Sequence, residues 1–191
     1  MIRRCGWIRD PLMERYHDEE WGEPVHDDRK HHEFLILDAF QAGLSWAIVL
    51  KKREGFRKAF AGFEPKKVAR FTSTRVEKIL QDPGIIRNRL KVKSAVTNAR
   101  AFLELQEEFG SFDKFIWQFT GGSTIQNRRK SLKHIPPRTR ESDAMSEALI
   151  ERGFKFAGST ICYAYMQAAG MVNDHVVTCF RHPQLARPRR R

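Results

Sequence analysis

Apolar residues along this chain recur at intervals of three and four positions far more often than they alternate with polar ones, which favours helices over strands. The pattern predicts helices over residues 29–42, 46–56, 74–80, 88–109, 112–119 and 142–152. Thr74 and Glu77 have the spacing of a capping box, which predicts where the third of these helices begins. The chain is therefore predicted to be mostly helical.

Two stretches do not follow a clear helical pattern. Residues 121–140 are polar and basic and contain Pro136-Pro137, so we expect them to form a long surface loop. Residues 154–166 are ambiguous, because their aromatic side chains and Ile161 would suit a strand equally well. No repeat or sharp boundary divides the chain, which predicts one helical domain over residues 1–183 and a disordered basic tail over 184–191.

Length and composition indicate a globular domain with a strongly basic surface. The 191 residues are 41% hydrophobic, enough to bury a sizeable core, and neither a signal peptide nor a membrane span is recognisable. Three cysteines are too few for a disulfide framework, so we expect a protein of the reducing cytoplasm, with Cys162 as a small buried apolar residue. Lys and Arg outnumber Asp and Glu by 35 to 23, a net charge of +12, which favours nucleic acid as a partner.

Four residues of the types that bind metals lie near the two ends of the chain: Cys5, His17, His175 and Cys179. His175 and Cys179 are four residues apart, so a helix would place both on one face. Two thiolates and two imidazoles would form a closed tetrahedral zinc site that joins the two ends and has a structural role. The spacing of Cys5 and His17 is looser than in zinc fingers, and the alternative that all four are ordinary core residues stays open.

A Pro83-Gly84 turn separates two of the predicted helices and looks like a helix-hairpin-helix clamp for the DNA backbone. Backbone N–H groups at such a turn, together with the dipole of the following helix, suit a phosphate. The candidate DNA contacts here are Gly84, Ile85, Arg87, Arg89 and Lys91. The alternative is a plain helical turn with a solvated basic face, and Ile86 stands where such hairpins often have a second glycine.

Four aromatic residues and one acid make up a third group: Trp7, Tyr16, Trp21, Trp46 and Asp38. Aromatic rings stack on a nucleobase and attract it more strongly if it is positively charged. A carboxylate among them could accept hydrogen bonds from the base and balance its charge. The group would suit an electron-poor purine, although aromatic residues at helical spacing are more often part of a core.

Eight short motifs, in one collinear order over about residues 5–179, resemble those of the bacterial 3-methyladenine DNA glycosylase I family. These motifs are Cys5-Gly-Trp7, Asp10-Pro-Leu12, Tyr16-His-Asp-Glu-Glu-Trp-Gly22, Gln41-Ala-Gly-Leu-Ser-Trp46, Leu50-Lys-Lys-Arg-Glu54, Gly84-Ile-Ile-Arg87, Arg152-Gly-Phe-Lys-Phe156 and Asn173-Asp-His-Val-Val177.

The resemblance implies an all-α helix-hairpin-helix DNA glycosylase whose ends are joined by structural zinc on the four Cys and His residues. It implies that the aromatic group binds a base flipped out of alkylated double-stranded DNA. Gly43 and Leu44 would then fill the gap that the base leaves in the duplex. We expect hydrolytic excision of 3-methyladenine without strand cleavage, by a monomer that needs no protein partner and no membrane.

The sequence departs from the family at the candidate catalytic residue, Asp38, where the resemblance implies a glutamate. The acid is kept but is shorter by one methylene, and Met13 stands where a pocket aromatic is usual. One alternative is therefore a zinc-containing protein that binds alkylated or distorted DNA without releasing a base. A metal-dependent hydrolase is a second alternative, but it would need a ligand position open to water.

Overall fold

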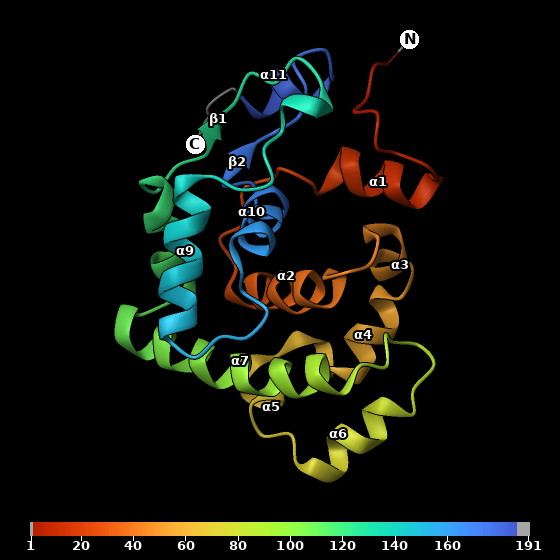
Figure 1. The fold of residues 1–191 in the computed structure, drawn as a ribbon, viewed down its shortest axis with the longest axis vertical. Helices are drawn as coiled ribbons and strands as arrows, with labels where there is room; N and C mark the ends of the chain where they lie inside the picture. Colours follow the sequence, from red (N-terminus) through yellow and green to blue (C-terminus); the bar gives the residue numbers. More distant parts are fainter. Residues whose placement is uncertain (1, 187–191) are drawn as a thin grey trace.

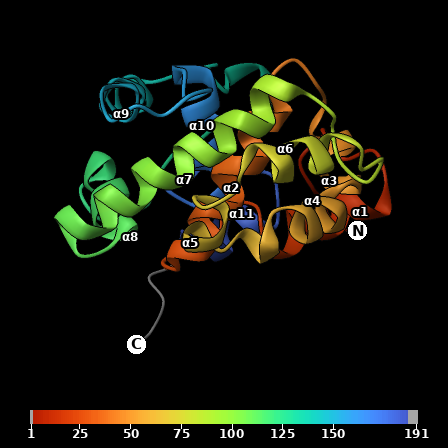
Figure 2. The same ribbon diagram turned by 90° about the horizontal axis from the view of Figure 1, so that it is seen from below.

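The computed structural model of the chain describes residues 2–186, and helices make up most of them (Figures 1 and 2). The α-helices are α1 (Pro11–Glu19), α2 (Asp28–Gln41), α3 (Trp46–Lys51), α4 (Arg53–Ala59), α5 (Pro65–Val68), α6 (Ser73–Leu80), α7 (Arg89–Phe109), α8 (Phe112–Trp117), α9 (Arg140–Glu151), α10 (Ser159–Ala168) and α11 (Arg181–Leu185). Short 3-10 turns are η1 (Ala61–Phe63), η2 (Gln118–Thr120) and η3 (Leu132–His134). The predicted helical class is confirmed.

The helix α7 is shared by the two largest hydrophobic clusters. Val92 and Val96, in its first half, pack with residues of α2 to α6, whereas Phe102 and Leu105 pack with α8, α9 and α10. Figure 1 shows α2 and α10 in the middle of the molecule, with α7 below them and α1 and α11 above; Figure 2 shows α8 at the far end of α7. A third, smaller cluster joins α1 to the segment before α11.

The helix ends show which local signals the sequence carries. Asn88 accepts a hydrogen bond from the backbone N–H of Lys91 at 3.1 Å, so the predicted helix after residue 88 begins as expected. The predicted capping box at Thr74 is wrong. Thr72 caps α6 instead, by accepting from the N–H of Arg75, and the carboxylate of Glu77 pairs with Arg89.

Three other segments differ from the sequence-based expectation or resolve it. The helix expected over residues 46–56 is interrupted at Lys52, which separates α3 from α4. The ambiguous stretch 154–166 is helical from Ser159 onward, as α10. The loop predicted over residues 121–140 is largely irregular, but it contains η3 and a strand of two residues, Ile125 and Gln126.

The two ends of the chain lie side by side. Strand β1 (Ile125–Gln126) pairs in parallel with β2 (Val172–Asn173), and the N–H of Phe180 donates to the carbonyl oxygen of Arg3 at 2.9 Å. Helix α11 continues two residues past the predicted domain end at 183. Residues 187–191 of the predicted basic tail lie outside the described residues. None of the helices over residues 2–186 combines the length and the apolar character that a membrane span requires.

A buried histidine in α2 links stability to pH. His32 is 1% exposed and donates its Nδ1–H to the carbonyl oxygen of Phe63 at 2.8 Å, and burial lowers its pKa to about 4. In the unfolded chain the imidazole has its ordinary pKa of about 6.5 and binds the proton at higher pH. The neutral ring therefore stabilises the fold fully above about pH 6.5, and this stabilisation is lost as the pH falls toward 4.

We expect the free energy of unfolding of the wild type to drop by roughly 2 to 3 kcal/mol between pH 6.5 and 4 because of His32. His32→Gln keeps a donor for Phe63 but cannot titrate, so it should lack this part of the drop. Urea unfolding at several pH values measures the difference, with His134→Gln as the control at an exposed histidine. Parallel pH profiles for the wild type and His32→Gln would contradict the assignment.

Candidate active site and metal centre

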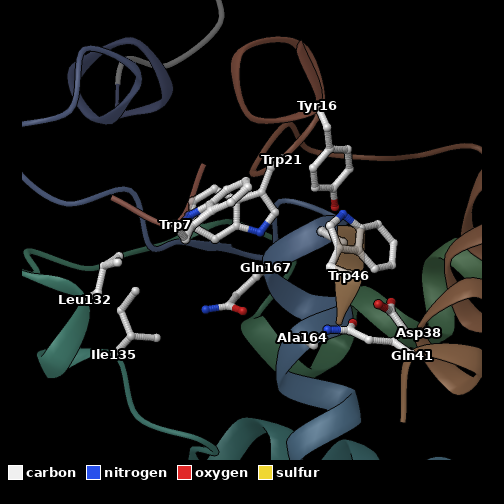
Figure 3. Close-up of a pocket in the computed structure, with 11 residues that line it drawn as sticks. Trp7, Tyr16, Trp21, Asp38, Gln41, Trp46, Leu132, Ile135, Ala164 and Gln167 are labelled. Atoms are coloured by element: carbon white, nitrogen blue, oxygen red, sulfur yellow. The ribbon is translucent and has the colours of Figure 1, made fainter. Parts of the chain in front are cut away.

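A cavity of about 380 Å³ lies between α1, α2, α3 and α10 (Figure 3). Its lining residues are Trp7, Tyr16, Trp21, Asp38, Gln41, Trp46, Leu132, Ile135, Ala164, Gln167 and Ala168. All five residues of the aromatic and acidic group singled out in the sequence are therefore brought together. The volume and the mostly apolar walls are typical of a site for a small organic molecule.

The aromatic rings form two walls of the cavity. Trp7 and Trp21 meet edge to face, with ring centroids 5.2 Å apart, and Tyr16 and Trp46 are tilted against each other at the same centroid distance. Figure 3 shows these two pairs facing the same space from different sides. Burial, and then the charge of Asp38, raise the pKa of Tyr16 well above its ordinary value, so its hydroxyl keeps its proton.

Asp38 lies in the last turn of α2 and is 3% exposed. Its Oδ2 atom has no hydrogen-bond partner in the described part of the chain, and burial raises the pKa of the carboxyl well above its ordinary value. The indole Nε1–H groups of Trp7 and Trp46 are also buried, and no acceptor for them lies among the residues that the structure describes. Buried polar atoms are nearly always paired, so these three atoms around one cavity indicate that a polar ligand completes their hydrogen bonding.

Several lining residues were missed in the sequence. Gln41 belongs to a motif word but carried no separate signal, and Gln167 comes from the stretch whose secondary structure was ambiguous. The Nε2 of Gln167 donates to Asp174 at 2.8 Å, which leaves its amide oxygen for the cavity. Leu132 and Ile135 come from the predicted surface loop, whose Pro-rich composition gave no reason to expect a pocket wall.

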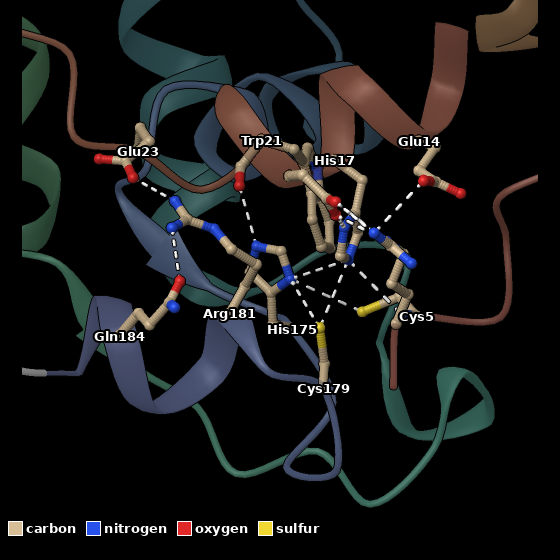
Figure 4. A network of polar contacts seen from close by, with 11 residues as sticks. Cys5, Glu14, His17, Trp21, Glu23, His175, Cys179, Arg181 and Gln184 are labelled. Carbon is tan, nitrogen blue, oxygen red and sulfur yellow. Dashed lines mark hydrogen bonds and ion pairs between the residues drawn. The ribbon is translucent and has the colours of Figure 1, made fainter. Parts of the chain in front are cut away.

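The four Cys and His residues from the two ends of the chain converge at one buried point (Figure 4). Their ligand atoms all lie within 4.8 Å of one another. Nε2 of His17 is 3.2 Å from Nδ1 of His175 and 3.4 Å from Sγ of Cys179, and Nδ1 of His175 is 3.7 Å from Sγ of Cys5. His175 and Cys179 lie in a turn before α11, so they meet without the helix that the spacing had suggested.

These separations can be compared with those of a tetrahedral zinc site. Zn–N bonds of about 2.0–2.1 Å and Zn–S bonds of about 2.3 Å place N–N pairs about 3.3 Å apart and N–S pairs about 3.5–3.6 Å apart. The observed 3.2 Å and 3.4–3.7 Å agree with these values. Hydrogen bonds, the one from the Cys5 thiol first, lower the pKa of Cys179, so a thiolate is favoured at Cys179, whereas the same bond raises the pKa of Cys5. The donor set therefore fits a zinc ion.

The outer ring nitrogens of both histidines have fixed partners. Nδ1 of His17 is 2.7 Å from the carboxylate of Asp18, and Nε2 of His175 donates to the carbonyl oxygen of Trp21 at 2.9 Å. Each of these bonds places the ring proton on the outer nitrogen, so both inner nitrogens present lone pairs to the centre. The rings of Trp7 and Trp21 pack against His17 and His175 with centroids 5.3 Å and 4.6 Å apart, so the cluster supports the cavity wall that these two tryptophans form.

The loop between α2 and α3 carries the predicted duplex contacts Gly43 and Leu44. Gly43 has φ +79°, a conformation that glycine adopts without strain, and Leu44 is an apolar side chain left 40% exposed. The N–H of Leu44 donates to the carbonyl oxygen of Gln41 at 2.6 Å. An exposed leucine thus stands one turn beyond the cavity residues of α2.

The Pro83-Gly84 turn joins α6 to α7 and packs tightly against α4, because a Cβ at Gly55 would come within 2.1 Å of the Gly84 oxygen. The N–H of Gly84 donates to Asp82 Oδ1 at 2.7 Å, so this donor is occupied within the turn. The side chain of Ile85 is buried in the core. The structure therefore leaves fewer free donors at the turn than the sequence suggested.

The basic residues after the turn do not all face solvent. Arg87 is exposed, and Arg89 is exposed but forms an ion pair with Glu77. Lys91 is 6% exposed, and its ammonium group donates to the carbonyl oxygens of Phe40 at 2.9 Å and Ala42 at 2.6 Å. Lys91 thus differs from the expected phosphate contact, because its charge is directed into the protein.

Comparisons with known proteins agree with this architecture. The sequence model of the methyladenine glycosylase family matches residues 7–182. The chain belongs to this family. DNA-3-methyladenine glycosylase 1 of Escherichia coli (strain K12) is 48% identical over 183 residues, which cover 95% of this chain and 98% of that protein. The enzyme class predicted from the sequence, a hydrolase of N-glycosyl bonds, is thereby confirmed.

Solved structures of methyladenine glycosylases share the whole fold. A crystal structure of a 3-methyladenine DNA glycosylase I superposes with a TM-score of 0.93 at 48% identity, covering 95% of this chain and 100% of the other. A single-residue variant of a 3-methyladenine DNA glycosylase I, in complex with 3-methyladenine, superposes with a TM-score of 0.91 at 31% identity, covering 94% and 97%. The fold is thus one on which a complex with this base has been observed.

Proposed function

We propose that this chain is a DNA repair glycosylase that flips 3-methyladenine out of alkylated duplex DNA and releases it by hydrolysis. The observation that carries the proposal is the buried, unpartnered carboxylate oxygen of Asp38 in a cavity walled by tryptophan and tyrosine rings. Methylation at N3 makes adenine cationic, and a cation between aromatic faces and a carboxylate is stabilised by both. The structural relative that contains 3-methyladenine supports the same assignment.

The charge of the substrate accounts for most of the chemistry. A cationic base is a good leaving group, so the enzyme has mainly to extrude it, hold it and admit water to the sugar. Extrusion costs a few kcal/mol and is easier for a damaged base, so selection begins before the cavity is reached. In the cavity, Asp38 and the aromatic walls would stabilise the departing base, which lowers the barrier to bond cleavage.

The residues around the cavity predict cleavage of the glycosidic bond alone. Among the described residues that line the cavity there is no lysine, which would be the nucleophile of an enzyme that also cuts the strand. Water is therefore the proposed nucleophile. Gly43 and Leu44 would fill the gap in the duplex, since Leu44 is the exposed apolar side chain next to the cavity helix.

The turn at Gly84 and Ile85 would act as a helix-hairpin-helix grip on the DNA backbone. Arg87 is the exposed cation that best fits a phosphate, and Arg89 could reach one by exchanging its ion pair with Glu77. The net charge of +12 would add nonspecific attraction to DNA. We propose that one domain, acting as a monomer, carries all of these contacts.

Cys5, His17, His175 and Cys179 would hold a structural zinc ion. Four protein ligands close a tetrahedral site, so the ion has no position for water or substrate, which argues against a metal-dependent hydrolase. Zinc would supply the charge that holds two thiolates together and would tie the N-terminal aromatic residues to the C-terminal segment. The proposed role of the ion is therefore structural: it joins the two segments and takes no part in the reaction.

An assay of base release tests the proposed function. Duplex DNA carrying methylated purines is incubated with the protein, and free bases are separated by chromatography while strand breaks are followed on a gel. We expect release of 3-methyladenine with abasic sites left in intact strands. Tight binding to methylated duplex with no released base would favour the second candidate, a DNA-damage binding protein, to which the shortened acid at Asp38 points.

A further inference from the structure

Lys91 is a buried lysine whose ammonium group has no acidic partner among residues 2–186. It is the third residue of α7, at the helix end where a positive charge is disfavoured by the helix dipole. Burial lowers its pKa, and no carboxylate contributes to the shift. Burying an unpaired charge is costly, so the contacts that Lys91 makes have to offset that cost.

Those contacts lie at the end of another helix. Lys91 donates to the carbonyl oxygen of Phe40, in the last turn of α2, and to that of Ala42, the C-cap residue; a helix leaves its last carbonyl groups without partners of its own. The last turn of α2 contains no basic residue, and the chain leaves it through Gly43. Lys91 therefore provides, from α7, both the donors and the positive charge that a helix C-terminus favours.

This helix end carries residues of the candidate active site. Asp38 and Gln41 lie in the last turn of α2 and line the cavity, and Leu44 follows three residues after Gln41. The other partner, α7, starts five residues after Gly84, and Asn88 caps its first turn by accepting from the N–H of Lys91. One side chain thus connects the start of the hairpin helix to the loop that holds Leu44.

We propose that Lys91 is a positioning residue. It holds the end of α2 and the loop that contains Leu44 at a fixed position relative to the turn at Gly84 before α7. The proposal rests on the proposed function, in which the hairpin grips the DNA backbone and Leu44 enters the duplex. Lys91 itself contacts neither DNA nor base. A phosphate held at the hairpin would then lie at a fixed position relative to both Leu44 and Asp38.

Lys91→Met, which keeps the length of the side chain but removes its charge, tests the proposal. Without DNA, the backbone amide of Leu44 should exchange its hydrogen about tenfold faster or more, because the loop loses its anchor. With methylated duplex bound at saturation, the rate of base release should fall by about 10- to 100-fold, as expected for misplaced groups. Lys93→Met, an exposed lysine of the same helix, is the matched control for Leu44 exchange.

The salt dependence of DNA binding separates positioning from a direct contact. If Lys91 only positions, the slope of log K against log salt should be the same for Lys91→Met and the wild type, whereas loss of a phosphate contact reduces it by about one. A reduced slope, or Leu44 exchange equal to that of the wild type, would overturn the proposal. If Lys91→Met does not fold, Lys91→Gln serves for the same measurements.

Failure of the proposal and failure of the proposed function give different results. Hydrogen exchange at Leu44 is measured without DNA, so it tests the anchoring role even if the wild type releases no base. Faster exchange together with an unchanged rate of base release would show that the loop position does not matter for catalysis, and would overturn the proposal while leaving the glycosylase assignment intact.

Discussion

Replacing Cys179 with serine is expected to remove the bound zinc and to lower the midpoint of thermal unfolding by about 10 °C or more. The ligand atoms of the cluster are buried and come from segments more than 150 residues apart. Within the described residues, no disulfide and no other cluster of metal ligands links these two segments. A structural zinc site contributes several kcal/mol to folding, and about 1 kcal/mol shifts the midpoint by roughly 2–4 °C in a domain of this size.

The matched control is Cys162→Ser, which changes the other buried cysteine. Its Sγ donates to the carbonyl oxygen of Ala157 and lies outside the cluster, so zinc content should stay at one per chain. Elemental analysis gives the zinc content and calorimetry the midpoint. Replacement of zinc by cobalt would give an absorption spectrum that reports tetrahedral coordination by sulfur and nitrogen.

Chelation distinguishes a structural metal from a catalytic one. If zinc is structural, its removal by a chelator should abolish activity and folded structure together, because the cavity wall at Trp7 and Trp21 depends on the cluster. Removal of the metal with loss of base release in a protein that keeps its midpoint would instead assign zinc to the chemistry. Full activity and stability without zinc would show that the four residues are ordinary core residues.

The sequence predicted those features that depend on residue type and local spacing. The long helix beginning after Asn88 follows from an amphipathic pattern and a good N-cap, whereas residue type made Cys5, His17, His175 and Cys179 candidates for a metal site without showing that they meet. The family resemblance added the pairing of the two ends, which spacing alone left open. A helix start that depends only on its own cap and its own apolar pattern could therefore be predicted without knowledge of the fold.

The features that the sequence did not predict depend on tertiary partners. Thr72, Ser73 and Thr74 are all possible caps in the sequence. In the structure Thr72 is the cap, and Glu77 pairs with Arg89 of the next helix and closes no capping box. Lys91 was grouped with basic residues near a turn, and only the position of α2 shows that its charge is internal. Gln167 and Leu132 line the cavity because of packing between distant segments.

Asp38→Asn is expected to reduce the rate of base release by about 10²- to 10³-fold, the cost of losing one preorganised electrostatic contact at a reacting group. The amide keeps the shape of the side chain and an oxygen acceptor but not the negative charge that holds a cationic base. Asp38→Glu restores the longer acid that the family resemblance implies and keeps the charge. It should therefore release base at a rate within about tenfold of the wild type.

Asp38→Asn is also expected to make the protein more stable at neutral pH. The pKa of Asp38 is raised in the folded protein, so the folded state binds the proton more tightly than the unfolded chain, and stability falls as the pH rises above the ordinary range of an aspartic acid. Asparagine removes that cost. A higher midpoint of unfolding at pH 7 together with slower base release would be the signature of a residue kept for function.

The pH dependence of base release provides the third part of this test. Because the ionised carboxylate is the form that holds a cation, the wild-type rate should fall as the pH drops through the raised pKa of Asp38. Asp38→Asn should lack this limb, and Asp38→Glu should keep it. If Asp38→Asn released 3-methyladenine as fast as the wild type at every pH, charge complementarity would not be the basis of recognition, and the aromatic walls alone would have to account for it.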